Sequence, residues 1–183
     1  MRYGTLLATL LVVLPGVTAT GVVASPTVPT TERVAAPQSP AGEVDLSVNG
    51  IRFGTSYADV VKAVGKPRNQ ARERVSADSC GPAYMDLGLT YGGLFIRMKG
   101  TPKGTDFKAV SFDVTSARWT IAPGIRVGMS DADLRKVVGD PGSTDEVEGT
   151  IVEHFVNAGN NGIANLFVKN GKLVRVAWEM KLC

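Results

Sequence analysis

The sequence predicts an α+β fold in which two tandem repeats each pack a short helix on an antiparallel β-meander. Residues 51–67 and 125–141 match without a gap at an offset of 74 (125 − 51), and ten positions are identical. Each copy carries the start and stop signals of one helix. Alternating apolar and polar residues follow both copies, a pattern typical of half-buried strands. A repeat at a fixed offset sets the architecture, so the two halves are expected to share one plan and form an open sheet.

The chain begins with a pattern typical of a secretory signal peptide. Arg2 supplies one positive charge, residues 6–14 are apolar, and small residues end at Ala24, with Ala19 as a second cleavage candidate. The apolar run is short for a membrane span, and no later stretch is long enough. Residues 1–24 are therefore expected to direct the protein to the periplasm or outside the cell. The alternative is an N-terminal anchor that stays attached.

The remaining chain divides by composition. Residues 25–42 are rich in Pro, Thr and Ala without apolar periodicity, which predicts a flexible linker. The tandem-repeat domain is expected at 43–183, with repeat one at 46–114, a connector at 115–124 and repeat two at 125–183.

Each repeat marks its helix with four residue types at the same spacing. The serine is an N-cap, and the aspartate three positions later resembles a capping box. The glycine suits a left-handed C′ position, and the proline prevents the helix from continuing. These markers are Ser56, Asp59, Gly65 and Pro67 in the first repeat, and Ser130, Asp133, Gly139 and Pro141 in the second.

Three strands are predicted after each helix, at 87–91, 94–98 and 109–114, then at 150–156, 163–169 and 173–180. Gly92-Gly93 and Asn170-Gly171 are the predicted tight turns. Residues 94–97 (Leu-Phe-Ile-Arg) match 166–169 (Leu-Phe-Val-Lys), so Phe95 and Phe167 are expected to be equivalent. Alternation places the leucines inward and puts both phenylalanines, with Arg97 and Lys169, on the opposite face. In the last strand Val174, Val176, Trp178 and Met180 are expected to share one face.

The Gly-x-Ser-x-x-Asp motif with its downstream Val-Gly resembles the SmpA/OmlA (BamE-like) outer-membrane assembly family. Its tandem use resembles the secreted β-lactamase inhibitor protein (BLIP) family, and the last hairpin, residues 166–178, also suits that family. The BLIP resemblance covers most of residues 46–183. It implies two helix-plus-sheet repeats side by side, with a concave sheet face that binds a protein.

Two cysteines, Cys80 and Cys183, remain in the exported chain. An even pair in an oxidising compartment predicts a disulfide, here between the first repeat and the C-terminus. Two unpaired thiols are the alternative.

Little in the sequence indicates catalysis. His154 is the single histidine and lies in an alternating strand, where a hydrogen-bonded or solvent-facing role is expected rather than a catalytic base. One histidine and two distant cysteines form no metal-ligand cluster. The formal net charge is +3, and no run of Lys or Arg stands out that would bind nucleic acid. We therefore expect no catalytic residue, no metal and no cofactor.

The aromatic residues indicate a binding role. Aromatic side chains beside cations are typical of protein-binding hot spots. The candidates are Phe95, Arg97, Phe167, Lys169 and Trp119, although core packing is an alternative for the aromatics. The sequence thus predicts a protein-binding module, such as an enzyme inhibitor that acts by steric occlusion. A cell-envelope adaptor of the SmpA/OmlA type is the alternative, and a small hydrolase is a third hypothesis.

Overall fold

The computed structural model describes residues 45–79, 81–156 and 162–181, which all belong to the compact unit Ala36–Cys183. The predicted signal peptide and linker, and both Cys80 and Cys183, lie outside the described residues. The export signal and the disulfide therefore stay predictions. None of the described helices is long and apolar enough to cross a membrane.

Two helices form where the cap signals predict them, α1 at Tyr57–Val64 and α2 at Asp131–Val138. The Ser56 hydroxyl accepts a hydrogen bond from Asp59 N at 3.2 Å and donates one to Asp59 Oδ2 at 2.6 Å. Ser130 and Asp133 repeat both bonds at 3.2 and 2.7 Å. Each aspartate thus receives the serine hydroxyl and does not reach back to the cap's own N–H.

Both helices end at a glycine whose conformation differs from the predicted one. Gly65 has φ 84° with ψ −173°, and Gly139 has φ 75° with ψ −161°. The positive φ is as expected, but ψ is extended rather than left-handed helical. This region is open almost only to glycine, and it turns the chain directly into the following strand.

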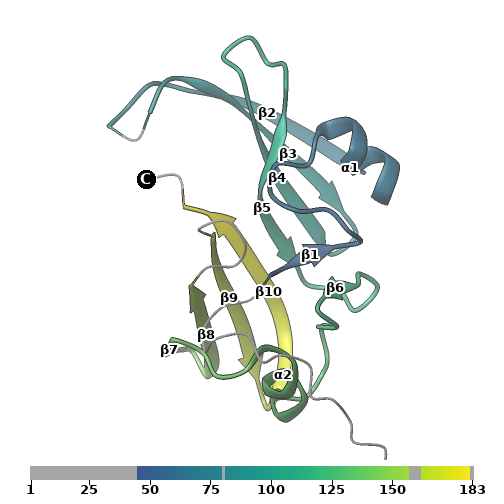
Figure 1. Ribbon diagram of the computed structural model, residues 1–183, viewed down its shortest axis with the longest axis vertical. Coiled ribbons are helices and arrows are strands. Elements are labelled where there is room, and N and C mark those ends of the chain that lie inside the picture. The colour runs from purple at the N-terminus through teal and green to yellow at the C-terminus, as the bar shows by residue number, and fades with distance from the viewer. Residues whose placement is uncertain (1–44, 80, 157–161, 182–183) are drawn as a thin grey trace, which may run out of the picture. The chain divides into compact units, whose positions relative to one another are not determined.

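Ten strands accompany the helices in the described residues. Their bounds are β1 Ser47–Val48, β2 Asn69–Val75, β3 Tyr84–Tyr91, β4 Leu94–Gly100, β5 Lys108–Val114, β6 Ile121–Ala122, β7 Ser143–Val147, β8 Thr150–Val156, β9 Gly162–Lys169 and β10 Lys172–Met180. Eight of them form one antiparallel sheet in the order β2-β3-β4-β5-β10-β9-β8-β7, and β1 pairs with β6. Figure 1 shows α1 beside the β2–β5 strands and α2 beside β8–β10.

The α+β class and the six predicted strands are confirmed, each strand within three residues of its expected bounds. Four strands were not predicted. β2 and β7 lie at the two edges of the sheet, and almost all their residues are exposed, so neither has an apolar alternation that could indicate it. β1 and β6 are only two residues long.

The two helices cover one face of the sheet. Val60 of α1 and Leu134 of α2 are 0% exposed and belong to the same core cluster as Ile96 and Leu166. On the α1 side, Tyr91 Oη donates to Gly65 O at 3.2 Å. Burial, followed by the neighbouring Tyr57, raises the pKa of Tyr91 to about 12. The predicted inward set, Leu94, Ile96, Leu166 and Val168, is buried on this face as expected.

A carboxylate is buried beneath α2. Glu153 of β8 is 0% exposed, and Arg135 of α2 donates to its Oε1 at 2.5 Å. Glu153 Oε2 has no hydrogen-bond partner among the described residues. Burial raises the pKa of Glu153, while Arg135 opposes the shift and the nearby Asp131 adds to it. The α2 side of the core is thus fixed partly by one ion pair.

The last strand departs from simple alternation. The pairing of β10 with β9 shifts between Leu173 and Arg175, which is a β-bulge. The bulge buries Leu173 completely and leaves Val174 40% exposed. The prediction that Val174 shares the inward face with Val176 and Trp178 is therefore wrong, because the extra residue changes the parity of the strand.

The two halves share a set of backbone contacts. In the first half Gly54 N donates to Ala109 O at 2.8 Å and Ala109 N to Thr55 O at 2.9 Å; in the second Gly128 N donates to Leu173 O at 2.7 Å and Leu173 N to Met129 O at 2.9 Å. Ser56, the N-cap of α1, bridges Lys108, and Ser130, the N-cap of α2, bridges Lys172. Each helix entry is therefore anchored to the last strand of its own meander.

The segment between the halves packs over the β3–β4 turn. Trp119 is 4% exposed, and its Nε1 donates to Gly92 O at 2.9 Å. Its ring meets Tyr91 edge-on at 6.0 Å between centroids. Trp119 is thus buried in the core and its indole is held by the turn, which favours the core-packing alternative over an exposed binding role.

Candidate functional site

The sheet face opposite the helices is here called the open face. It carries, from β4, β5, β10 and β9 in turn, Phe95 and Arg97; Ser111 and Asp113; Arg175, Ala177 and Glu179; and Asn165 and Phe167. None of these nine residues is buried. Among the described residues no helix packs on this face.

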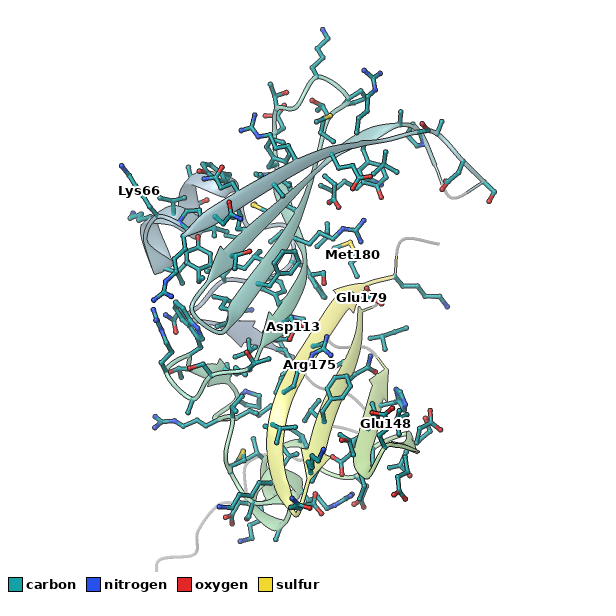
Figure 2. The ribbon with its side chains drawn as sticks, turned by 180° about the vertical axis from the view of Figure 1, so that it is seen from behind. Lys66, Asp113, Glu148, Arg175, Glu179 and Met180 are labelled. Carbon is teal, nitrogen blue, oxygen red and sulfur yellow. The ribbon has the colours of Figure 1, made fainter. Side chains whose placement is uncertain are left out.

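Two strands from different halves meet at the middle of this face. β5 and β10 pair antiparallel, with Asp113 opposite Ala177 and Ser111 opposite Glu179. Arg175 reaches across the junction, donating from Nε to Asp113 Oδ1 at 2.9 Å and from Nη2 to Asp113 Oδ2 at 2.6 Å. Figure 2 shows Asp113 and Arg175 extended toward one another from their strands. This two-point geometry fixes both side chains in orientation.

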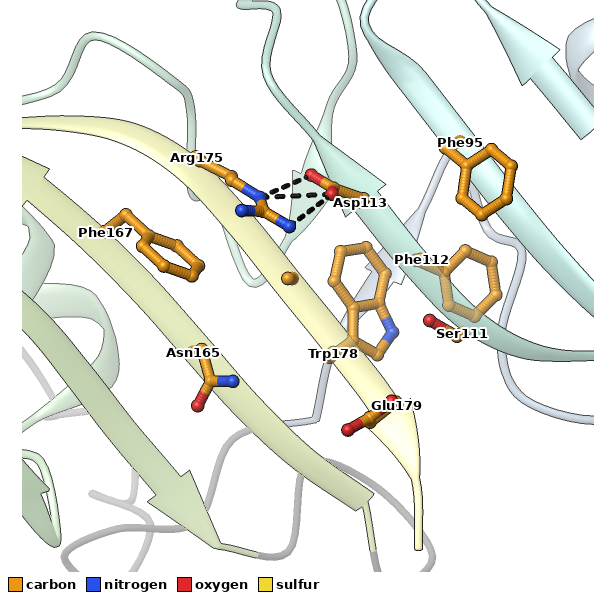
Figure 3. Close-up of a pocket in the computed structure, with 10 residues that line it drawn as sticks. Phe95, Ser111, Phe112, Asp113, Asn165, Phe167, Arg175, Trp178 and Glu179 are labelled. Carbon is orange, nitrogen blue, oxygen red and sulfur yellow. Dashed lines mark hydrogen bonds and ion pairs between the residues drawn. The ribbon is translucent and has the colours of Figure 1, made fainter. Parts of the chain in front are cut away.

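A pocket of about 260 Å³ lies over the junction. Its lining comprises Phe95, Ser111, Phe112, Asp113, Asn165, Phe167, Arg175, Ala177, Trp178 and Glu179. In Figure 3 the rings of Phe95 and Phe167 stand on opposite sides of β5 and β10. Because Ser111 and Ala177 are small, the surface is hollow between larger neighbours.

The two phenylalanines differ in their surroundings. Phe95 is 40% exposed, and its ring lies over Gly88, where an added Cβ would come within 3.0 Å of it. Phe167 is partly buried, with the Arg175 guanidinium 4.7 Å from its ring centroid. Phe167 is thus ordered by a cation, and Phe95 by contact with backbone.

The predicted equivalence of Phe95 and Phe167 is wrong in the sheet register. Lys99 pairs with Lys108, and Lys169 pairs with Lys172, next to the two helix caps. Arg97 lies two residues before Lys99 on β4, and Phe167 lies two residues before Lys169 on β9. Phe167 therefore occupies the position that Arg97 has in the first half. The match of residues 94–97 with 166–169 is thus displaced by two residues, which preserves the face but not the position.

The two predicted cations take different roles. Arg97 Nε donates to Asp86 Oδ2 at 2.7 Å, and its Nη2 donates to Tyr84 Oη at 3.2 Å. Partial burial by itself lowers the pKa of the Arg97 guanidinium, but the contact with Asp86 raises it overall. Lys169 is exposed at the end of β9 and does not line the pocket.

His154 is engaged through both ring nitrogens. Its Nδ1 lies 2.8 Å from Asn165 Oδ1, and its Nε2 lies 3.0 Å from Asp145 Oδ2. No group of three or more metal-ligating side chains occurs among the described residues. The arrangement matches the hydrogen-bonded strand role expected from the sequence.

Several pocket residues are not among the candidates that the sequence indicates. Asp113, Arg175 and Glu179 lie on alternating strands, so their face could be predicted, but their meeting depends on the pairing of β5 with β10. Asp113 and Arg175 are 62 residues apart in sequence. No local pattern signals a contact of that separation.

No protein-family model matches the chain, and no curated protein matches it. Its fold has distant likenesses among solved structures. A cysteine-rich secretory protein from Staphylococcus aureus is 13% identical, with a TM-score of 0.46 over 79% of this chain and 48% of that one. An extracellular protein containing a SCP domain from Bacillus anthracis is 12% identical, with a TM-score of 0.42 over 71% of this chain and 44% of that one.

A protein provisionally described as a β-lactamase inhibitor protein, from Streptococcus mutans, is 14% identical. It aligns with a TM-score of 0.27 over 75% of this chain and 90% of that one. The chain spans less than half the length of the first two structures. At these scores and identities, none of the three likenesses carries an argument about function.

Proposed function

We propose that this chain is an exported protein-binding module in which two copies of one helix-plus-meander unit present a continuous sheet face to a partner protein. The duplication is supported by the matching cap bonds and strand anchors of the two halves. Export is supported by the pattern of residues 1–24. The module would act by covering the partner's surface, as an inhibitor does, without a catalytic step.

The observation that carries the proposal is the exposed Phe95 beside a hollow on the open face, which no described helix covers. A large aromatic side chain at 40% exposure is costly to leave in water, and partner burial would recover that cost. Arg97 and Arg175 are already held by Asp86 and Asp113, so they would lose little further freedom on docking. An aromatic anchor among ordered charged groups is the composition of a protein-binding centre.

The test is affinity capture from culture fluid and cell envelope with the exported protein, its Phe95→Ala variant and an Ile151→Ala control. Ile151 is 43% exposed, close to the value for Phe95, but it lies on the helix face opposite Val168. We expect a partner that wild type and Ile151→Ala retain and Phe95→Ala loses, with all three proteins folded by circular dichroism. Equal capture by all three would refute docking on the open face.

A further inference from the structure

The pocket on the open face has an uncompensated negative charge. Three of its lining residues are charged: Asp113, Arg175 and Glu179. Arg175 and Asp113 neutralise one another through hydrogen bonds of 2.6 to 3.1 Å. Glu179 makes no ion pair among the described residues, so the lining has one free carboxylate.

The cations nearest to Glu179 along the sheet do not satisfy it. Arg97 flanks Ser111 on β4, as Glu179 does on β10, but the Arg97 guanidinium is directed to Asp86 and Tyr84. Lys181, two residues on, is exposed and forms no ion pair with Glu179 within the described part of the chain. Figure 3 shows Glu179 at one end of the pocket, past Ser111.

The phenyl rings offer the second half of a cation site. The Arg175 guanidinium already lies over Phe167, which shows that this face accommodates a stacked cation. Over Phe95 no such cation is found among the described residues, although the ring is 40% exposed. One aromatic face and one carboxylate, neither paired with a charged group in the described ranges, thus line the same hollow.

The size of the hollow limits what can enter it. A volume of about 260 Å³ is below the range of about 300–1,000 Å³ typical of drug-sized ligands. It is suited to one long side chain. A planar guanidinium can stack on an aromatic ring and donate two hydrogen bonds to one carboxylate, which an ammonium cannot do.

We propose that the pocket over the β5–β10 junction receives an arginine side chain of the partner protein, with its guanidinium stacked on Phe95 and paired with Glu179. This inference rests on the proposed function and adds the chemistry of the contacting group. Ser111 and Ala177 leave the space that the side chain occupies, and the Arg175–Asp113 pair also lines it, with Asp113 opposite Phe95 in the sheet.

The experiment titrates the ¹⁵N-labelled protein with N-acetyl-L-arginine methylamide and follows its amide chemical shifts. N-acetyl-L-citrulline methylamide, which replaces the guanidinium by an uncharged urea of the same shape, is the matched ligand control. Glu179→Gln is the test variant. Glu146→Gln is its control, because Glu146 is equally an exposed strand glutamate but lies on β7, opposite Ile151.

We expect saturable shifts at Ser111, Ala177 and Glu179 with the arginine probe and much weaker ones with citrulline. An exposed ion pair contributes modestly, so Glu179→Gln should weaken arginine binding about three- to fivefold. Glu146→Gln should leave it unchanged. Equal binding of arginine and citrulline, or no shift with arginine up to about 50 mM, would overturn the inference.

The arginine titration and the affinity-capture experiment can fail independently of one another. If Phe95→Ala abolishes capture of a partner while the arginine probe does not bind, docking on the open face stands and the arginine assignment fails. If the probe binds but no partner depends on Phe95, the pocket accepts a guanidinium and the binding-module proposal fails.

Discussion

Gly93 provides a quantitative test of how the segment between the two halves is held. It is the second residue of the β3–β4 turn, with φ 73°, and a Cβ built on it would lie 2.3 Å from Ser116 Cβ. The backbone N and Cα of Ser116 follow at 3.2 and 3.3 Å. Gly93→Ala therefore has two costs: a left-handed backbone for alanine, about 1–2 kcal/mol, and an overlap that must displace the segment, about 1–3 kcal/mol.

Gly171 supplies a matched control. It is also the second residue of a two-residue hairpin turn, with φ 69°, but a Cβ there would meet no atom within 4 Å. Gly171→Ala should therefore show the backbone cost alone, about 1–2 kcal/mol. The difference between the two variants measures the contact with Ser116.

Urea unfolding followed by tryptophan fluorescence gives both free energies of unfolding. We expect Gly93→Ala to be less stable than Gly171→Ala by about 1–3 kcal/mol, and Ser116→Gly to recover part of that difference in the double variant. Equal losses in the two single variants would show that the segment does not press on the β3–β4 turn.

Three further predictions concern the ion pairs and the buried tryptophan. Burial raises the pKa of Glu153 above 4.5, so the stability it contributes is complete below that pH and is lost as pH rises through the raised pKa. Chemical denaturation from pH 4 to 8 should thus show a shallower decline for Glu153→Gln than for wild type, and parallel curves would contradict the assignment. A double-mutant cycle with Asp113→Asn and Arg175→Gln should give a coupling of about 0.5–1 kcal/mol, and additive losses would argue against their contact. Trp119→Phe should lose about 1 kcal/mol with the bond to Gly92 O while partner capture is retained; lost capture would make Trp119 a contact residue after all.

Local sequence signals are enough to predict the two helices and the interior strands. Ser56 and Ser130 predict their helices because an N-cap needs only a few neighbouring residues. Strands such as β4 and β9 could be predicted because one of their faces is buried, which forces alternation. β2 and β7 could not, since a strand exposed along nearly all its length has no such constraint.

The sequence predicts which sheet face carries the candidate site, but not which residues come together to form it. Alternation correctly separates Phe95 and Phe167 from the buried leucines beside them. The sequence gives no signal for the β10 bulge, so alternation alone places Val174 on the wrong face. The pairing of Asp113 with Arg175 depends on the contact of the two meanders, which arises from tertiary packing rather than from any local pattern.

The charged outer strands of the sheet restrict how it can associate. β2 carries Arg72, Glu73 and Arg74 on one border, and β7 carries Asp145 and Glu146 on the other. A foreign strand that lengthened the sheet at either border would have to lay its backbone beside these charges and strip their water. Edge-to-edge addition of further strands is thus opposed at both borders. The open face in the middle of the sheet is then the surface left for association with another molecule.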